Sequence, residues 1–248
     1  MSCQKEMMDV DNSESYTINS SYTNIEYNIQ VLYPENYDMS KEYSTIYLLD
    51  GDWYFYDISE FVKSNYASEV ILVGIGYKND NERLTDYTYP QDNSYSNSSG
   101  GGDKYISFLT KELIPYIEND LSIKSYETTI AGHSLGGYFA LYQMLQETNA
   151  TEFDNVIAIS PSLFWKDSYI FDLEKQYKSN NDTLEKKLYI TIGDIEGVTM
   201  NTYFDAFCTV IENRDYKNLT FEYHRIENTS HNGNAIKSIR NGISFILH

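Results

Sequence analysis

The chain has 248 residues, of which 41% are hydrophobic, and a formal net charge of -19 at pH 7. This acidity argues against nucleic acids and anionic membrane surfaces as partners, because both repel a negatively charged protein. No run of about 18 apolar residues is present, so we expect no transmembrane segment. The length suits one α/β domain or two small ones, and the hydrophobic content allows a sizeable core.

The N-terminal residues are polar and acidic, and we predict that residues 1–15 form a disordered tether ahead of a folded domain at 16–248. Cys3 follows Ser2 near the start, as at the cleavage site of a bacterial lipoprotein. This predicts a lipid anchor at Cys3 and a location in the cell envelope. The alternative is an ordinary cysteine in a cytoplasmic protein. Cys208 lies on an apolar helical face and is expected to be a buried thiol.

Apolar runs alternate with amphipathic segments along the rest of the chain. The predicted strands are 25–33, 44–49, 70–77, 127–131, 155–160, 188–192 and 219–226. The predicted helices are 53–63, 103–119, 135–146, 199–212 and 235–247, and a long loop spans 79–102. Strands that alternate with helices indicate an α/β fold, with a mostly parallel central sheet and helices on both faces.

A G-x-S-x-G motif surrounds Ser134, between a predicted strand and an apolar-faced helix. This pattern is typical of the sharp turn that exposes a nucleophilic serine. Such a serine needs an acid and a histidine, in that order along the chain. His231 follows the last predicted strand, whereas the other three histidines lie in the turn, within a strand and at the C-terminus. His231 is therefore the predicted base.

Two carboxylates, Asp194 and Glu196, follow the next-to-last predicted strand. We favour Glu196 as the acid because it lies further into the loop that His231 must reach, and Asp194 remains the alternative. The backbone N–H groups of Leu135 and Asp52 are the predicted oxyanion donors. The sequence has no metal-ligand spacing, dinucleotide motif or P-loop, so no metal or cofactor is expected.

Several segments together resemble the "putative esterase" branch of the α/β-hydrolases, which includes siderophore esterases, feruloyl esterases and S-formylglutathione hydrolase. The matching segments are IYLLDG (46–51), RLTDYTYP (83–90), GGDKYISFL (101–109), ELIPYI (112–117), AGHSLGG (131–137), SPSLFW (160–165) and IGDIE (192–196). The resemblance implies an α/β-hydrolase fold, with Ser134 as nucleophile, His231 as base, Glu196 as acid and Asp52 as oxyanion donor. In the family, tryptophan often occupies the position of Phe164 and threonine the position of Tyr89. These positions line the family's cleft, so the two departures bear on which substrate is bound and leave the expected chemistry unchanged.

The resemblance implies a serine esterase that acts on a small-molecule ester, such as a catechol trilactone or another aromatic or carbohydrate-linked ester. Arg83 is a candidate for binding an anionic or catechol substrate, with an ion pair to Asp86 as the alternative. Trp165 and the tyrosine-rich segment 87–95 are candidates for stacking on the substrate. An acyltransferase or thioesterase on the same fold and a non-catalytic surface binding protein remain as alternative functions.

Overall fold

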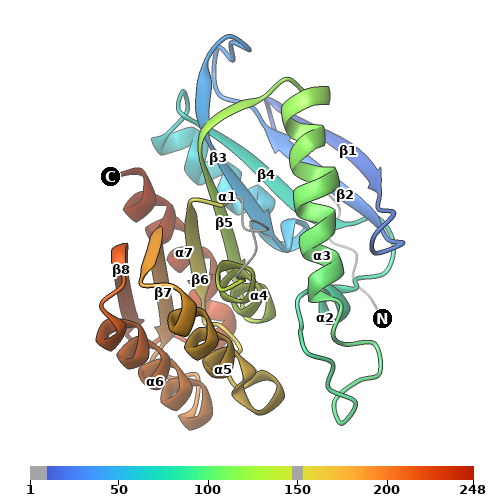
Figure 1. Cartoon of the computed structure of the whole chain (residues 1–248). Helices are drawn as coiled ribbons and strands as arrows, with labels where there is room; N and C mark the ends of the chain where they lie inside the picture. Colours follow the sequence, from blue (N-terminus) through green and yellow to red (C-terminus); the bar gives the residue numbers. More distant parts are fainter. Residues whose placement is uncertain (1–9, 147–152) are drawn as a thin grey trace.

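The computed structural model describes residues 10–146 and 153–248, which fold around one eight-stranded sheet (Figure 1). The strand order is β1-β2-β4-β3-β5-β6-β7-β8. Among the described strands only β2 runs against the others, so the predicted mostly parallel α/β sheet is confirmed. The bounds are β1 Ser13–Asn19, β2 Glu26–Leu32, β3 Glu42–Leu49, β4 Val70–Tyr77, β5 Lys124–His133, β6 Asn155–Ile159, β7 Thr183–Gly193 and β8 Lys217–Ile226.

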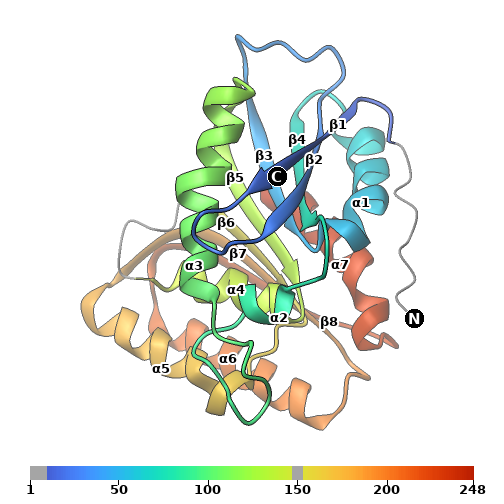
Figure 2. The same cartoon turned by 90° about the vertical axis from the view of Figure 1, so that its right-hand side faces the viewer.

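Helices cover both faces of this sheet. They are α1 Gly51–Asn65, α2 Arg83–Asp86, α3 Gly102–Phe108, α4 Leu135–Met144, α5 Trp165–Asn180, α6 Val198–Arg214 and α7 His231–Leu247. Two π-helical turns, Leu109–Leu113 and Tyr116–Asp120, continue α3. Figure 2 shows α1 and α7 on one face and α3 to α6 on the other.

The core therefore has two apolar layers, one on each side of the central strands. Continuous apolar strands such as β3 and β4 supply both layers, because successive side chains point to opposite faces. Tyr47 of β3 belongs to the layer under α3 to α6, and its neighbour Leu48 belongs to the layer under α1 and α7. Burial on both faces fixes the register of the parallel strands, and with it the positions at which these strands end.

Many of the tyrosines, 25 in the whole chain, lie in this core. The ring of Tyr27 stacks on Phe108 with ring centroids 4.0 Å apart. The hydroxyls of Tyr27 and Tyr77 donate to the buried carboxylate of Asp86 over 2.8 and 3.0 Å. Burial raises the pKa of Asp86 to about 7, and the two tyrosine hydrogen bonds only partly oppose this effect. The hydroxyls therefore find partners inside the protein, as buried tyrosines generally do.

The N-terminal part of the chain differs from the prediction. Strand β1 begins at Ser13, so the last residues of the expected tether 1–15 belong to the sheet. Cys3 and its proposed lipid anchor lie outside the described residues. Cys208 is a buried free thiol, as predicted. None of the helices in the described ranges is long and apolar enough to cross a membrane.

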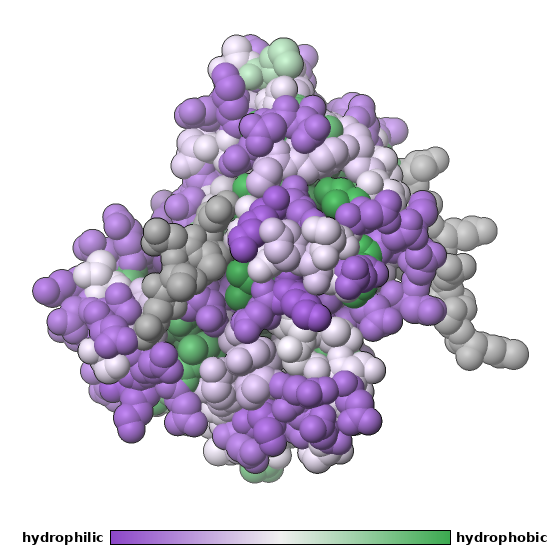
Figure 3. Space-filling model, turned by 45° about the vertical axis from the view of Figure 1, so that its right-hand side comes forward, coloured by the Kyte–Doolittle hydropathy of each residue, from purple (hydrophilic) through white to green (hydrophobic). Residues whose placement is uncertain are grey.

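The molecular surface reflects the composition of the chain. In Figure 3, hydrophilic residues predominate on the visible face, and hydrophobic residues form only small, separate patches between them. Hydrophilic side chains on this face are in contact with water, as is usual for polar and charged residues.

Candidate active site

The site is built at the carboxyl ends of the parallel strands, where Ser134 stands between β5 and α4. Its backbone is forced into φ 61° and ψ -118°, a region that non-glycine residues rarely adopt. The turn is tight because a Cβ atom at Gly132 would lie 2.4 Å from the backbone of Gly136. Only glycine at position 132 allows β5 and α4 to approach this closely, and the approach lifts the Ser134 hydroxyl out of the turn.

His231, which is distant from Ser134 in the sequence, lies next to this hydroxyl. Its Nε2 atom lies 2.9 Å from Ser134 Oγ. The last helix was predicted to begin at residue 235, and this was wrong, because α7 begins at His231. The loop after β8 is therefore shorter than expected, and the start of a helix holds the imidazole opposite the serine.

Glu196 completes the arrangement, with its Oε2 atom 2.7 Å from Nδ1 of His231. Its Oε1 atom accepts hydrogen bonds from the Ser160 hydroxyl at 2.5 Å and from the Gly193 N–H at 2.6 Å. Burial alone would raise the pKa of Glu196, but the hydrogen bonds from His231, Ser160 and Gly193 outweigh it and lower the pKa. Glu196 is thus a buried carboxylate that can stabilise a positive charge on His231.

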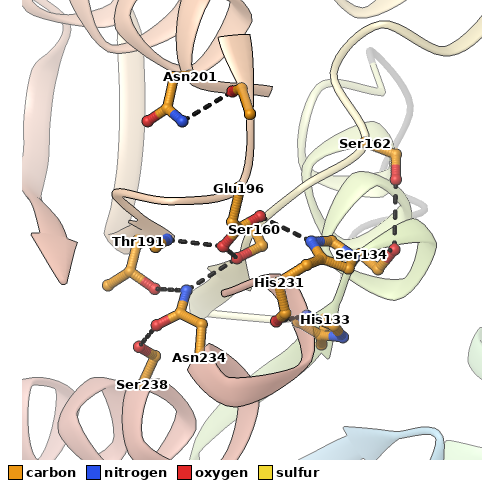
Figure 4. Close-up of polar contacts among 12 residues, drawn as sticks. His133, Ser134, Ser160, Ser162, Thr191, Glu196, Asn201, His231, Asn234 and Ser238 are labelled. Carbon is orange, nitrogen blue, oxygen red and sulfur yellow. Dashed lines mark hydrogen bonds and ion pairs between the residues drawn. The ribbon is translucent and has the colours of Figure 1, made fainter. Parts of the chain in front are cut away.

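Further polar residues support this carboxylate through a chain of hydrogen bonds, and the sequence analysis missed their role (Figure 4). Asn234 of α7 donates to Ser160 Oγ over 2.8 Å and accepts from Ser238. Ser160 follows β6 in a left-handed conformation, with φ 43°. The available signal was the Ser160-Pro161-Ser162 segment directly after a buried strand, to which we had assigned no role.

Asp194, the alternative acid, has a different position. Its Oδ1 atom accepts the backbone N–H of Thr229 over 3.1 Å. This contact ties the loop after β7 to the loop before α7. Backbone hydrogen bonds, first that of Asn228 and then those of Thr229 and Ile195, lower the pKa of Asp194. No contact between Asp194 and His231 is found among the hydrogen bonds of the described residues, so the geometry favours Glu196 as the partner of the histidine.

The two expected oxyanion donors both lie in the first turn of a helix, Leu135 in α4 and Asp52 in α1. Backbone N–H groups of a first turn have no acceptor within their own helix and carry the positive end of its dipole. The side chain of Asp52 accepts the N–H of Tyr77 over 2.8 Å. This bond pins the start of α1 to the end of β4, so the segment that carries the Asp52 N–H is held in place.

The two expected substrate-binding side chains, Arg83 and Trp165, are both engaged in contacts within the protein. Arg83 forms a bidentate ion pair with the fully buried Asp50. Its Nε donates to Oδ1 over 2.9 Å and its Nη2 donates to Oδ2 over 3.0 Å. The alternative pair with Asp86 is therefore wrong. Trp165 is only 4% exposed and donates its indole N–H to the carbonyl of Pro90. Exposed aromatic rings include Trp53, directly after Asp52, and Phe164, two residues after Ser162. Tyr95 of the segment 87–95 is also exposed, and its ring lies 5.5 Å from that of Trp165.

The arrangement of Ser134, His231 and Glu196 can perform acyl transfer. A hydroxyl next to an imidazole, which is in turn next to a buried carboxylate, is the geometry of an activated nucleophile. Within residues 10–146 and 153–248, no group of three or more His, Cys, Asp or Glu side chains could hold a metal ion.

Comparison with known proteins finds relatives that are named as esterases. The model of the "Putative esterase" family matches residues 20–232. The ferri-bacillibactin esterase BesA of Bacillus subtilis is 28% identical over 208 residues, which are 74% of this chain and 71% of BesA. A siderophore enterobactin esterase of Emericella nidulans is 28% identical, over 62% of this chain and 59% of its own length.

The likeness extends over the whole fold. The crystal structure of the BES protein from Bacillus cereus superimposes with a TM-score of 0.85 at 26% sequence identity. The match covers 99% of this chain and 98% of the BES chain. An α/β-hydrolase fold is therefore common to both proteins.

Proposed function

The chain belongs to the putative esterase family and is a carboxylic ester hydrolase, and on this premise we propose that Ser134, His231 and Glu196 form its catalytic triad. The main support is the unbroken hydrogen-bonded path from Ser134 Oγ through His231 to Glu196, with steps of 2.9 and 2.7 Å. Three residues from distant parts of the sequence form this path at one edge of the sheet.

In the proposed reaction, Ser134 Oγ attacks the ester carbonyl while Nε2 of His231 takes the hydroxyl proton. The N–H groups of Asp52 and Leu135 stabilise the oxyanion that forms. The bond to the leaving alcohol breaks as His231 returns the proton to it, which leaves an acyl group on Ser134. Water, deprotonated by His231, then hydrolyses this acyl-enzyme and restores the serine. Glu196 stabilises the imidazolium in both halves.

We further propose that the substrate is a siderophore ester, or a related aromatic ester. Relatives named for bacillibactin and enterobactin point to this class. Trp53 and Phe164 supply exposed aromatic surface, 45% and 43% accessible. Trp53 directly follows Asp52, and Phe164 comes two residues after Ser162, whose hydroxyl oxygen lies 3.5 Å from Ser134 Oγ. Aromatic rings with one free face stack well on a catechol or feruloyl group.

A panel of four esters tests this proposal: a catechol trilactone, methyl ferulate, S-formylglutathione and a short-chain nitrophenyl ester. We expect the trilactone to give the highest kcat/KM and Ser134→Ala to abolish turnover of every ester. If Ser134→Ala keeps the wild-type rate, the proposed triad is refuted. If S-formylglutathione is the best substrate, a thioesterase replaces the siderophore esterase, and transfer to an added alcohol would identify an acyltransferase.

A further inference from the structure

We propose that His133 and Tyr54 form a positioning relay, which holds the backbone of His231 so that its imidazole stays in line with Ser134. The proposal rests on the function of His231 as the base. His133 directly precedes the nucleophile, and the sequence analysis assigned it no role. Its ring lies beside that of His231 (Figure 4), with the two ring centroids 4.5 Å apart.

The hydrogen bonds of His133 define the state of its ring. Its Nε2 atom lies 3.0 Å from the backbone carbonyl of His231. A carbonyl can only accept, so the proton is on Nε2 and Nδ1 is the acceptor. Nδ1 lies 3.1 Å from the hydroxyl of Tyr54, which therefore donates to it. Both ring nitrogens are thus satisfied in a single neutral tautomer, which the His231 carbonyl selects and the Tyr54 hydroxyl complements.

The surroundings keep this ring neutral. His133 is 3% exposed, and burial is the first cause that lowers its pKa to about 4. The charges of His231 and Arg83 act in the same direction, whereas the hydrogen bond to the His231 backbone and the charge of Glu196 oppose them. A neutral His133 places no like charge against the imidazolium that forms on His231 during turnover.

His231 needs such support because packing alone does not fix it. Its side chain is 35% exposed, in contrast to the fully buried Glu196 that holds its other side. The relay joins three elements: Tyr54 lies two residues after the Asp52 donor in α1, His133 ends β5 directly before the nucleophile, and His231 begins α7. One chain of hydrogen bonds therefore sets the relative positions of oxyanion donor, nucleophile and base.

The test compares His133→Leu with His133→Gln in steady-state kinetics on a nitrophenyl ester. Leucine removes both hydrogen bonds, whereas a glutamine side-chain amide can still donate to the His231 carbonyl. We expect His133→Leu to lower kcat by up to about 100-fold, because a misplacement of about 1 Å is sufficient for such a loss. KM should change little, and His133→Gln should recover most of kcat. The exposed His224 of β8 gives the matched control, and His224→Leu should behave as wild type.

Thermal unfolding and proton NMR separate positioning from folding. The downfield resonance of the proton shared by His231 and Glu196 should shift or broaden in His133→Leu and return in His133→Gln. Tyr54→Phe, which removes only one hydroxyl, should show the same change to a smaller degree even if His133→Leu does not fold. Wild-type kcat and an unmoved resonance in Tyr54→Phe and His133→Leu would overturn the relay. An inactive wild-type enzyme would instead refute the proposed function.

Discussion

Glu196→Gln is the substitution that probes the proposed triad most sharply, because it changes one atom and the shape hardly at all. The buried carboxylate accepts three hydrogen bonds, from His231, Ser160 and the Gly193 N–H. The glutamine oxygen can replace only one of the two carboxylate oxygens. Since two donors converge on Oε1, the amide nitrogen is expected to take the Oε2 position and face Nδ1 of His231.

An amide nitrogen there donates to Nδ1 and forces the proton of His231 onto Nε2. The imidazole then donates to Ser134 and cannot accept the hydroxyl proton. A wrong tautomer of this kind lowers kcat by about 10⁴-fold in a serine protease triad. At about 1.36 kcal/mol for each factor of ten, this is a barrier increase of about 5.4 kcal/mol.

The assay is kcat for a nitrophenyl ester, with circular dichroism to establish that the variant is folded. Asp194→Asn is the matched control in the same loop, and we expect its kcat to lie within a few-fold of wild type. If Glu196→Gln is folded and loses less than tenfold in kcat while Asp194→Asn loses the larger factor, the assignment of Glu196 as the acid is refuted.

Four further predictions concern stability and substrate charge. Arg83→Met leaves the buried Asp50 carboxylate unpaired and should cost about 3–5 kcal/mol in urea unfolding, and a loss below 1 kcal/mol would contradict this. Gly132→Ala drives a methyl group into the backbone of α4 and should cost at least about 1–3 kcal/mol by the same measurement. The folded state lowers the pKa of Glu196 below its ordinary 4.5, so the unfolded chain takes up the proton first on acidification. The free energy of unfolding therefore decreases as the pH is lowered below 4.5, and this decrease should be shallower in Glu196→Gln than in wild type. With a net charge of -19, the enzyme should hydrolyse an anionic ferric complex with a kcat/KM that rises with salt, whereas a neutral ester should show no such rise.

Much of the central sheet could be predicted because its strands are buried on both faces. Segments 44–49 and 70–77 are continuous apolar runs, and they correspond to β3 and β4. Strand β1 escaped prediction for the opposite reason. It is a polar edge strand whose residues are all at least partly exposed, so its composition resembles a disordered tail.

Helix α5 was not predicted at all, because a charged residue occupies one of its buried positions. Glu174 is fully buried and pairs with Arg214 of α6 at 2.8 Å, and it accepts the hydroxyl of Tyr216. Glu174 occupies a buried position next to Ile170 and Leu173 where an apolar residue is expected, so the apolar periodicity of the helix is not visible in the sequence. An ion pair between two helices is set by tertiary structure and leaves no local signal in the sequence.

The candidate site, too, could be predicted only in part. The order of serine, acid and histidine follows from the positions of the strand ends, which a sequence reveals. The partner of Arg83 could not be found in this way, because Asp50 follows β3, Asp86 lies in α2 with Arg83, and both carboxylates are buried. The supporting roles of Ser160, Asn234 and Tyr54 likewise depend on side-chain contacts between elements that are distant in the chain.

Labelling with a fluorophosphonate, followed by mass spectrometry of the digested protein, tests the central claim most directly. This probe reacts with a serine hydroxyl that a neighbouring base has activated. We predict a single modified peptide that contains Ser134 in the wild type, and no modification in His231→Gln. An enzyme that hydrolyses esters while Ser134 stays unmodified would contradict the account.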